Sequence, residues 1–113
     1  MNNRDYRILI KLVDEIDLIG EMIKGYTLDT FLDDEKTKRA VSMTLINIGE
    51  LVKNLTEEFK ISNSTIPWKW IAGLRDVTAH KYQTLEMGDI WITVTEDVKL
   101  LEHKIRVLIE KPL

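Results

Sequence analysis

The segment from Arg75 to Tyr82, which reads Arg-Asp-Val-Thr-Ala-His-Lys-Tyr, holds the residue types of this sequence with the clearest potential for chemistry. An arginine can hold phosphate oxygens and stabilise the negative charge that develops on them. A histidine can accept or donate a proton near neutral pH. Arg75 and His80 therefore suit work on a phosphodiester, with an RNA 2′-hydroxyl as the nucleophile. The residue types alone, however, favour a structural reading, in which the arginine caps a helix and the histidine fills its end.

Helical geometry relates Arg75, Asp76 and His80 within this segment. Asp76 and His80 are four residues apart and share one face of a helix, so we expect the carboxylate to orient the imidazole and favour its charged form. Arg75 lies five residues before His80, which is roughly 140° around the helix. Arg75 and His80 can converge if the helix ends or bends near His80. They can also converge if a second copy of the segment faces the first across a dimer axis.

The charge of this region is opposite in sign to that of the whole chain. The chain has a formal net charge of −3 and a sequence pI near 5.4, which argues against indiscriminate binding to nucleic acid. Residues 67–82, in contrast, carry three Lys or Arg residues and one Asp. Lys69 and Lys81 are therefore candidate RNA contacts, and Trp70 is a candidate for stacking on a base.

Metal and thiol chemistry have little support in the sequence. The chain contains no cysteine, and its two histidines, His80 and His103, lack the spacing of metal ligands. We therefore expect no metal and no other cofactor. The absence of cysteine, together with an N-terminus that does not read as a signal peptide, favours a cytoplasmic location. No apolar run is long enough to span a membrane, so we expect no membrane association.

Apolar residues recur at helical spacing along almost the whole chain. The pattern predicts helices over 3–24, 35–60, 67–80 and 87–110, with a turn or short helical piece over 27–34. Gly25 is a natural helix stop, and Pro67 suits a first helical turn. Residues 1–113 are therefore predicted to form a single all-α domain, an antiparallel four-helix bundle. The second and last apolar stripes are broader than one bundle face requires, which favours a homodimer over a thick core.

Two further residues bear on the packing of these helices. Gly49 lies inside the predicted helix 35–60, where glycine costs about 1 kcal/mol relative to alanine. We expect it to mark a close approach between helices. Trp91 lies on the apolar stripe of the last helix, so we assign it to the core.

The order of these features resembles one protein family. Arg75-x4-His80-x-Tyr82 matches the R-x4-H-x-Y signature of the HEPN superfamily, and the whole chain resembles its HepT-like family. That family is the toxin half of type II HEPN/MNT toxin–antitoxin modules. Five further segments fit the resemblance at short, unbroken spacing: Asp34-Glu35-Lys36-Thr37, Ile48-Gly49-Glu50, Ile66-Pro67-Trp68, Gly73-Leu74-Arg75 and Ile90-Trp91.

The resemblance implies a specific enzyme. HepT-like proteins are HEPN-type four-helix-bundle homodimers, and the motifs of both subunits line one cleft at the interface. They act as metal-independent endoribonucleases. Arg75 would then bind and stabilise the scissile phosphate, and His80 would transfer protons. The residue after the arginine is commonly asparagine in this family, whereas here it is Asp76, which could orient His80 but would also repel phosphate.

The resemblance also implies a protein partner. In related modules an MNT-type nucleotidyltransferase antitoxin adds AMP to the motif tyrosine, which makes Tyr82 the expected modification site. Bulky anionic groups at that position would block the cleft and mask its positive charge. The plainer reading makes Tyr82 a packing residue with an exposed hydroxyl. A different class of function also fits, in which the chain is a non-catalytic protein that binds a nucleotidyltransferase.

Overall fold

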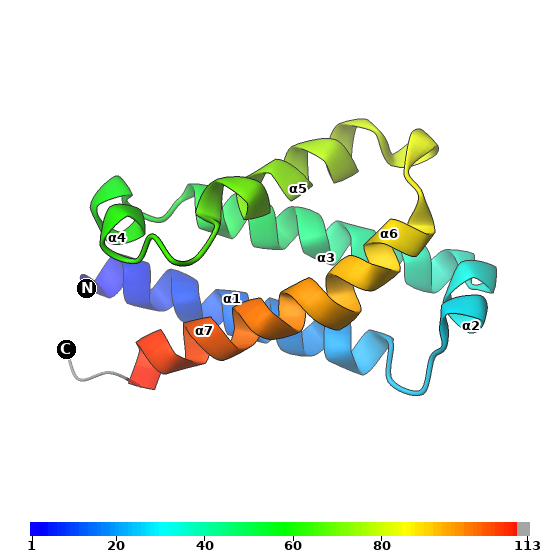
Figure 1. Ribbon diagram of the computed structural model, residues 1–113, viewed down its shortest axis with the longest axis horizontal. Helices are drawn as coiled ribbons and strands as arrows, with labels where there is room; N and C mark the ends of the chain where they lie inside the picture. The colour runs from blue at the N-terminus through cyan, green and yellow to red at the C-terminus, as the bar shows by residue number, and fades with distance from the viewer. Residues whose placement is uncertain (111–113) are drawn as a thin grey trace.

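The computed structural model describes residues 1–110, and every regular element in that range is a helix (Figure 1). This confirms the predicted all-α class. The α-helices are α1 (Asn3–Met22), α2 (Leu28–Asp33), α3 (Glu35–Lys53), α4 (Glu57–Ser62), α5 (Trp68–His80), α6 (Met87–Ile92) and α7 (Val98–Glu110). A short 3₁₀ helix, η1 (Tyr82–Thr84), follows α5, and a π-helical stretch, η2 (Thr93–Asp97), joins α6 to α7.

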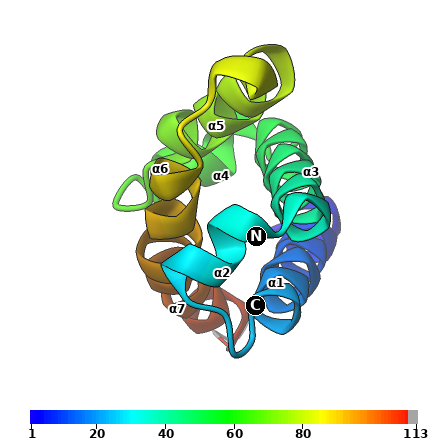
Figure 2. The same cartoon turned by 90° about the vertical axis from the view of Figure 1, so that its right-hand side faces the viewer.

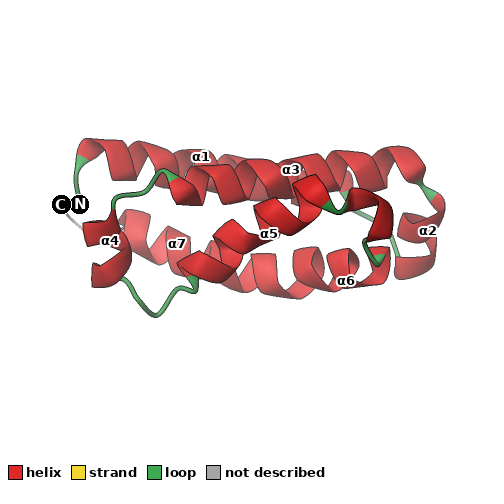
Figure 3. Cartoon of the chain, turned by 90° about the horizontal axis from the view of Figure 1, so that it is seen from above, coloured by secondary structure: helices red, strands yellow, loops and turns green. Residues whose placement is uncertain are grey.

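Successive long segments of the chain alternate in direction along the long axis of the molecule (Figure 1). Helix α3 packs against both α1 and α5, and α7 packs against α1. Figure 3 shows α5 lying obliquely across the molecule. Viewed along the long axis, the long segments surround a common centre, with α2 across one end (Figure 2). Within residues 1–110, every helix is too short or too polar to cross a bilayer.

The core consists of the predicted apolar stripes. Phe31 of α2 lies at one end of the core and is fully buried. Each buried Leu or Ile side chain contributes about 1.5–3 kcal/mol to folding. The largest fully buried apolar side chains come from α1, α2, α3, α5, η2 and α7: Leu9, Leu12, Ile19, Phe31, Val41, Leu45, Ile48, Val52, Ile71, Val94 and Ile105. Trp91, which we assigned to the core, is half-buried at its edge, with its ring centroid 5.1 Å from that of Phe31.

The predicted helix over 35–60 is correct as far as Lys53 and wrong in its continuity, because α3 ends there and a separate helix, α4, begins at Glu57. The break is made by Asp5 of α1, which is only 1% exposed. Its carboxylate accepts hydrogen bonds from the backbone N–H of Thr56 (3.0 Å) and from Thr56 Oγ1 (2.7 Å). Thr56 Oγ1 in turn accepts from the Phe59 N–H and caps α4. In a continuous helix the Thr56 N–H would donate to the backbone carbonyl four residues earlier. Here it donates to Asp5 instead, and Thr56 caps a new helix.

The other predicted boundaries agree more closely with the structure. Helix α1 ends at Met22, and Gly25 has the left-handed φ of 79° that favours glycine. Helix α5 ends at His80, as predicted. The last predicted helix, over 87–110, has the expected span, although the π-helical turn of η2 interrupts it. A π turn accommodates one extra residue in a helix.

The start of α3 is fixed by a polar corner. Asp34 caps the helix by accepting a hydrogen bond from the Thr37 N–H at 3.0 Å. Its carboxylate also accepts from Tyr26 Oη at 2.5 Å. The Tyr26 hydrogen bond, with the bonds from Thr37, lowers the pKa of the Asp34 carboxyl to about 2. This corner sets where α3 begins, and α3 carries half of the candidate site.

Candidate functional site

Helices α3 and α5 approach each other closely where Gly49 faces Arg75. A Cβ atom at position 49 would overlap the Arg75 Cβ and would lie 3.2 Å from both the Cα and the N atom of Arg75. Any side chain at this position would therefore push α5 away from α3. The structure confirms the prediction that Gly49 marks a close approach between helices. It also shows that the residue brought close is the arginine of the motif.

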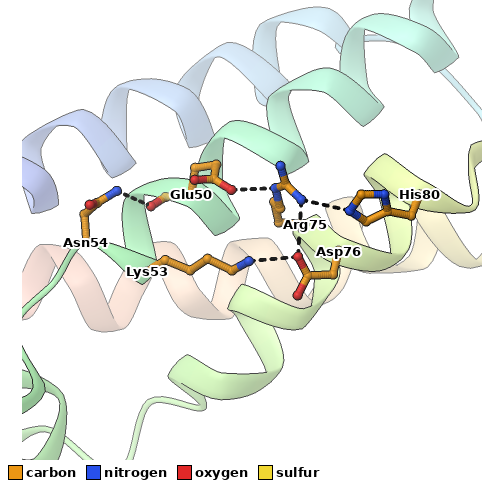
Figure 4. A network of polar contacts seen from close by, with 6 residues as sticks. All are labelled: Glu50, Lys53, Asn54, Arg75, Asp76 and His80. Carbon is orange, nitrogen blue, oxygen red and sulfur yellow. Dashed lines mark hydrogen bonds and ion pairs between the residues drawn. The ribbon is translucent and has the colours of Figure 1, made fainter.

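Arg75 is held at this contact by charged side chains from both helices (Figure 4). Its Nε atom lies 2.5 Å from Glu50 Oε1, and its Nη1 atom lies 3.3 Å from Asp76 Oδ1. Nε is buried and has no well-aligned hydrogen-bond acceptor among the described residues, so the Glu50 contact acts through charge. The Arg75 side chain remains 27% exposed. Glu50 and Asp76 thus hold the guanidinium in place, while part of it remains exposed to solvent.

The same guanidinium contacts His80. Arg75 Nη1 lies 3.2 Å from His80 Nε2. Because an arginine N–H can only donate, Nε2 accepts this bond, and the contact fits a neutral ring with its proton on Nδ1. The two side chains converge within one chain because α5 ends at His80, which was one of the geometric conditions derived from the sequence. His80 therefore presents an accepting nitrogen directly beside an arginine.

Asp76 has different partners from those that we expected. Its Oδ1 accepts a hydrogen bond from Lys53 Nζ at 2.8 Å and one from Arg75, so Arg75 lies between Asp76 and His80. The hydrogen bond from Lys53, with the charges of Lys53 and Arg75, lowers the pKa of the Asp76 carboxyl below its ordinary value. Asp76 is thus ionised at neutral pH, and Lys53 offsets the negative charge that it adds beside Arg75.

The remaining motif residues lie just beyond the end of α5. Lys81 is the exposed residue that follows the helix. Tyr82 begins η1 and is half-buried, with the Arg39 guanidinium carbon 5.2 Å from the centre of its ring. This contact is of the cation–π type. It places Tyr82 against α3, at the same end of α5 as His80.

Lys69 and Trp70 lie at the other end of α5. Both side chains are exposed, and both line a hollow between α5 and α4. The structure therefore gathers Arg75, Asp76 and His80 into one network and leaves Lys69 and Trp70 beside it.

Sequence reasoning left Glu50 without a position and did not identify Lys53. Both follow Gly49 on α3 and contact α5 residues. The signal that could have found them is Gly49 itself. Once a glycine marks a helix crossing, charged residues one and four positions later are candidates to meet the partner helix.

The network can bind an anion and move a proton. The exposed part of the guanidinium offers N–H donors to a phosphate, and His80 Nε2 can accept a proton when its hydrogen bond from Arg75 is released. Two carboxylates, Glu50 and Asp76, balance two cations, Arg75 and Lys53. Among residues 1–110, no group of three His, Asp or Glu side chains is arranged to hold a metal ion.

Comparisons with known proteins identify the family of the chain. A family model described as "Ribonuclease HepT-like" matches residues 12–108. A protein of Thermococcus cleftensis named "Probable ribonuclease HepT" is 36% identical over 107 residues, which cover 95% of this chain and 96% of that protein. A protein of Methanocaldococcus jannaschii named "Putative RNase" is 40% identical over 105 residues, which cover 89% of this chain and 84% of that protein. A protein of Caldanaerobacter subterraneus with the same kind of name is 35% identical over 100 residues, or 88% and 89% of the two chains. No solved structure matches this chain.

The Gly49 contact can be tested by adding a single methyl group. We expect Gly49→Ala to lower the free energy of unfolding by about 1–2 kcal/mol, because overpacking against α5 outweighs the gain in helix propensity. Urea unfolding followed by circular dichroism measures this change.

Gly73→Ala is the matched control for this substitution, because a Cβ at position 73 of α5 would meet no atom within 4 Å. That variant should be at least as stable as the original chain. If Gly49→Ala were as stable as Gly73→Ala, the close α3–α5 contact would be contradicted.

Proposed function

The chain belongs to the ribonuclease HepT-like family, and from this premise we propose that it is an endoribonuclease that cleaves RNA with Arg75 and His80 and needs no metal ion. The observation that carries the proposal is the 3.2 Å contact between Arg75 Nη1 and His80 Nε2. In this contact Arg75 would serve as the phosphate-binding group and His80 as the proton acceptor beside it. The names of the relatives support RNA as the substrate.

The proposed reaction follows from the chemistry of the two side chains. Arg75 binds the non-bridging oxygens of the scissile phosphate and stabilises their growing negative charge. His80 Nε2 accepts the proton of the 2′-hydroxyl, whose oxygen attacks the phosphorus. The bond from phosphorus to the 5′-oxygen breaks, and that oxygen takes up a proton. The products are a 2′,3′-cyclic phosphate and a 5′-hydroxyl.

We further propose that the enzyme is a homodimer with a four-helix-bundle subunit, in which two copies of the Arg75–His80 network line one cleft. Exposed apolar side chains on the last helix support association between copies. Leu100 and Val107, two of the residues that broaden the apolar stripe of that helix, are exposed on α7. Apolar residues exposed together on one helix commonly mark a protein interface.

The biological role that we propose is that of a cytoplasmic toxin controlled by an MNT-type nucleotidyltransferase antitoxin. Tyr82 would be the residue to which AMP is added. Its half-buried ring lies against Arg39 at the end of α5 that carries His80. A nucleotide attached to Tyr82 would add bulk and negative charge near His80, and both would hinder the binding of RNA.

A second candidate function is a non-catalytic protein that binds a nucleotidyltransferase. The balanced charges of the Arg75 network favour it, because Glu50 and Asp76 reduce the attraction of Arg75 for a phosphate. In that function Tyr82 would stay unmodified, and RNA would remain intact.

Cleavage of RNA in excess EDTA tests the ribonuclease proposal. The unaltered protein should generate 2′,3′-cyclic phosphate ends. His80→Ala should cleave at least about 10²-fold more slowly, because a positioned acid–base group contributes about that much or more. His103→Ala, which removes the other histidine from an exposed position of α7, should cleave normally. The proposal fails if the unaltered protein is inactive, if it depends on added metal, or if His80→Ala remains fully active.

Mass spectrometry after co-expression with a nucleotidyltransferase tests the role of Tyr82. The tyrosine oxygen would form a bond to the α-phosphorus of ATP, and pyrophosphate would leave. We expect one or more AMP units on Tyr82, no modification of Tyr82→Phe, and unchanged modification of Tyr6→Phe. A tight complex with unmodified Tyr82 would instead indicate inhibition by occlusion and would contradict this part of the account.

A further inference from the structure

An open hollow of about 770 Å³ lies beside the Arg75 network, and the proposed reaction makes no use of it. Its walls come from the end of α3, from α4 and its following loop, and from the first turns of α5. The lining includes Lys53, Lys60, Ile61, Lys69 and Trp70. Lys53 belongs to both places, because it lines the hollow and also donates to Asp76 of the network.

The lining combines cations with an exposed apolar floor. The Trp70 side chain is 47% exposed and that of Ile61 is 73% exposed. Trp68, which also lines the hollow, is buried and fixed by a hydrogen bond from its Nε1 to the Asn63 carbonyl at 3.1 Å. Exposed Trp and Ile side chains in one concave surface are a sign of a binding surface.

The lysines identify the kind of partner. Lys53, Lys60 and Lys69 line the hollow with a single acidic residue, Glu57, which pairs with Lys60 at 2.8 Å. Positive charge with exposed aromatic and aliphatic surface is the composition of sites that bind single-stranded nucleic acid. There, phosphates meet lysines and bases stack on aromatic rings. An apolar protein segment would use the exposed apolar side chains but would leave Lys69, which has no ion-pair partner among the described residues, without a role.

We propose that this hollow binds a single-stranded stretch of RNA next to the scissile phosphate, with a base stacked on Trp70 and a phosphate at Lys69. The inference rests on the proposed ribonuclease function. Trp70 and Arg75 are five residues apart on α5, which is about 7.5 Å along the helix and roughly 140° around it. The hollow and the network meet at Lys53, which lines the hollow and donates to Asp76, so a strand held at Arg75 can reach the hollow past this lysine.

Binding of an RNA analogue that cannot be cleaved tests the hollow separately from catalysis. The probe is a single-stranded, fully 2′-O-methylated oligonucleotide of about ten nucleotides, within the usual size range of such sites. Tryptophan fluorescence and anisotropy are recorded on the full chain. The oligonucleotide should quench the fluorescence of the unaltered protein, and most of that quenching should be lost in Trp70→Phe.

The affinities of the variants for the oligonucleotide distinguish stacking on Trp70 from a purely structural role of this residue. Trp70→Phe should bind within about twofold of the unaltered protein, because phenylalanine also stacks, whereas Trp70→Ala should bind about fivefold or more weakly. Lys69→Met should weaken binding and reduce the salt dependence by about one phosphate contact. Trp91→Phe and Lys99→Met are the matched controls and should behave like the unaltered protein. Melting temperatures confirm that each variant is folded.

Each remaining outcome decides the question. If the quenching persists in Trp70→Phe, if Trp70→Ala binds normally, or if the unaltered protein does not bind, the inference is wrong. Dissociation of a dimer by Trp70→Ala without a change in binding would make the hollow an interface between copies and would also overturn it. If binding follows the prediction but RNA is never cleaved, the hollow stands and the ribonuclease proposal fails. If Trp70→Ala and Lys69→Met cleave RNA as well as the unaltered protein, the ribonuclease proposal stands and the proposal for the hollow fails.

Discussion

The candidate site depends on the close contact between α3 and α5 at Gly49 and Arg75. Because position 49 carries no side chain, the backbone of α5 can approach α3 closely enough for Glu50 to reach the buried Nε of Arg75. The guanidinium is then fixed on one side, and its Nη1 atom is directed at His80. A larger residue at position 49 would move the arginine and the helix that carries it. The geometry of the motif is therefore set by a residue outside the motif.

The carboxylates around Arg75 have two opposing effects on its ability to bind a phosphate. Glu50 and Asp76 orient the guanidinium, but each also weakens its attraction for a phosphate. Lys53 offsets Asp76 by donating to its carboxylate at 2.8 Å, and it belongs to the lining of the hollow as well. The same lysine thus connects the network in which we place the chemistry with the surface on which we place the RNA strand. Positive charge is supplied locally in a chain whose net charge is −3.

The sequence predicts much of the fold because its signals are local. Periodicity and single residues predict the apolar stripes of α1 and α3, the stop near Gly25 and the end of α5 at His80. The break between α3 and α4 could not be predicted, because it depends on Asp5, which lies 51 residues from Thr56 in sequence. Glu50 and Lys53 escaped prediction as partners of Arg75 and Asp76 for the same reason, since they lie on another helix. Gly49 is the exception, because it marked the contact even though the sequence did not say what it touches.

We propose that Arg75 acts through its forked geometry, held by Glu50 and directed at His80, and not through its charge alone. Single-turnover cleavage of RNA by Arg75→Lys tests this claim most directly, because lysine keeps the charge but cannot contact Glu50 and His80 at the same time. We expect the rate to fall by about 10²-fold or more, because a fixed donor to the developing charge is lost. Binding of the 2′-O-methylated oligonucleotide should change little. Cleavage by Arg75→Lys at the rate of the unaltered protein would show that the charge of Arg75 is sufficient and that its forked geometry is not required.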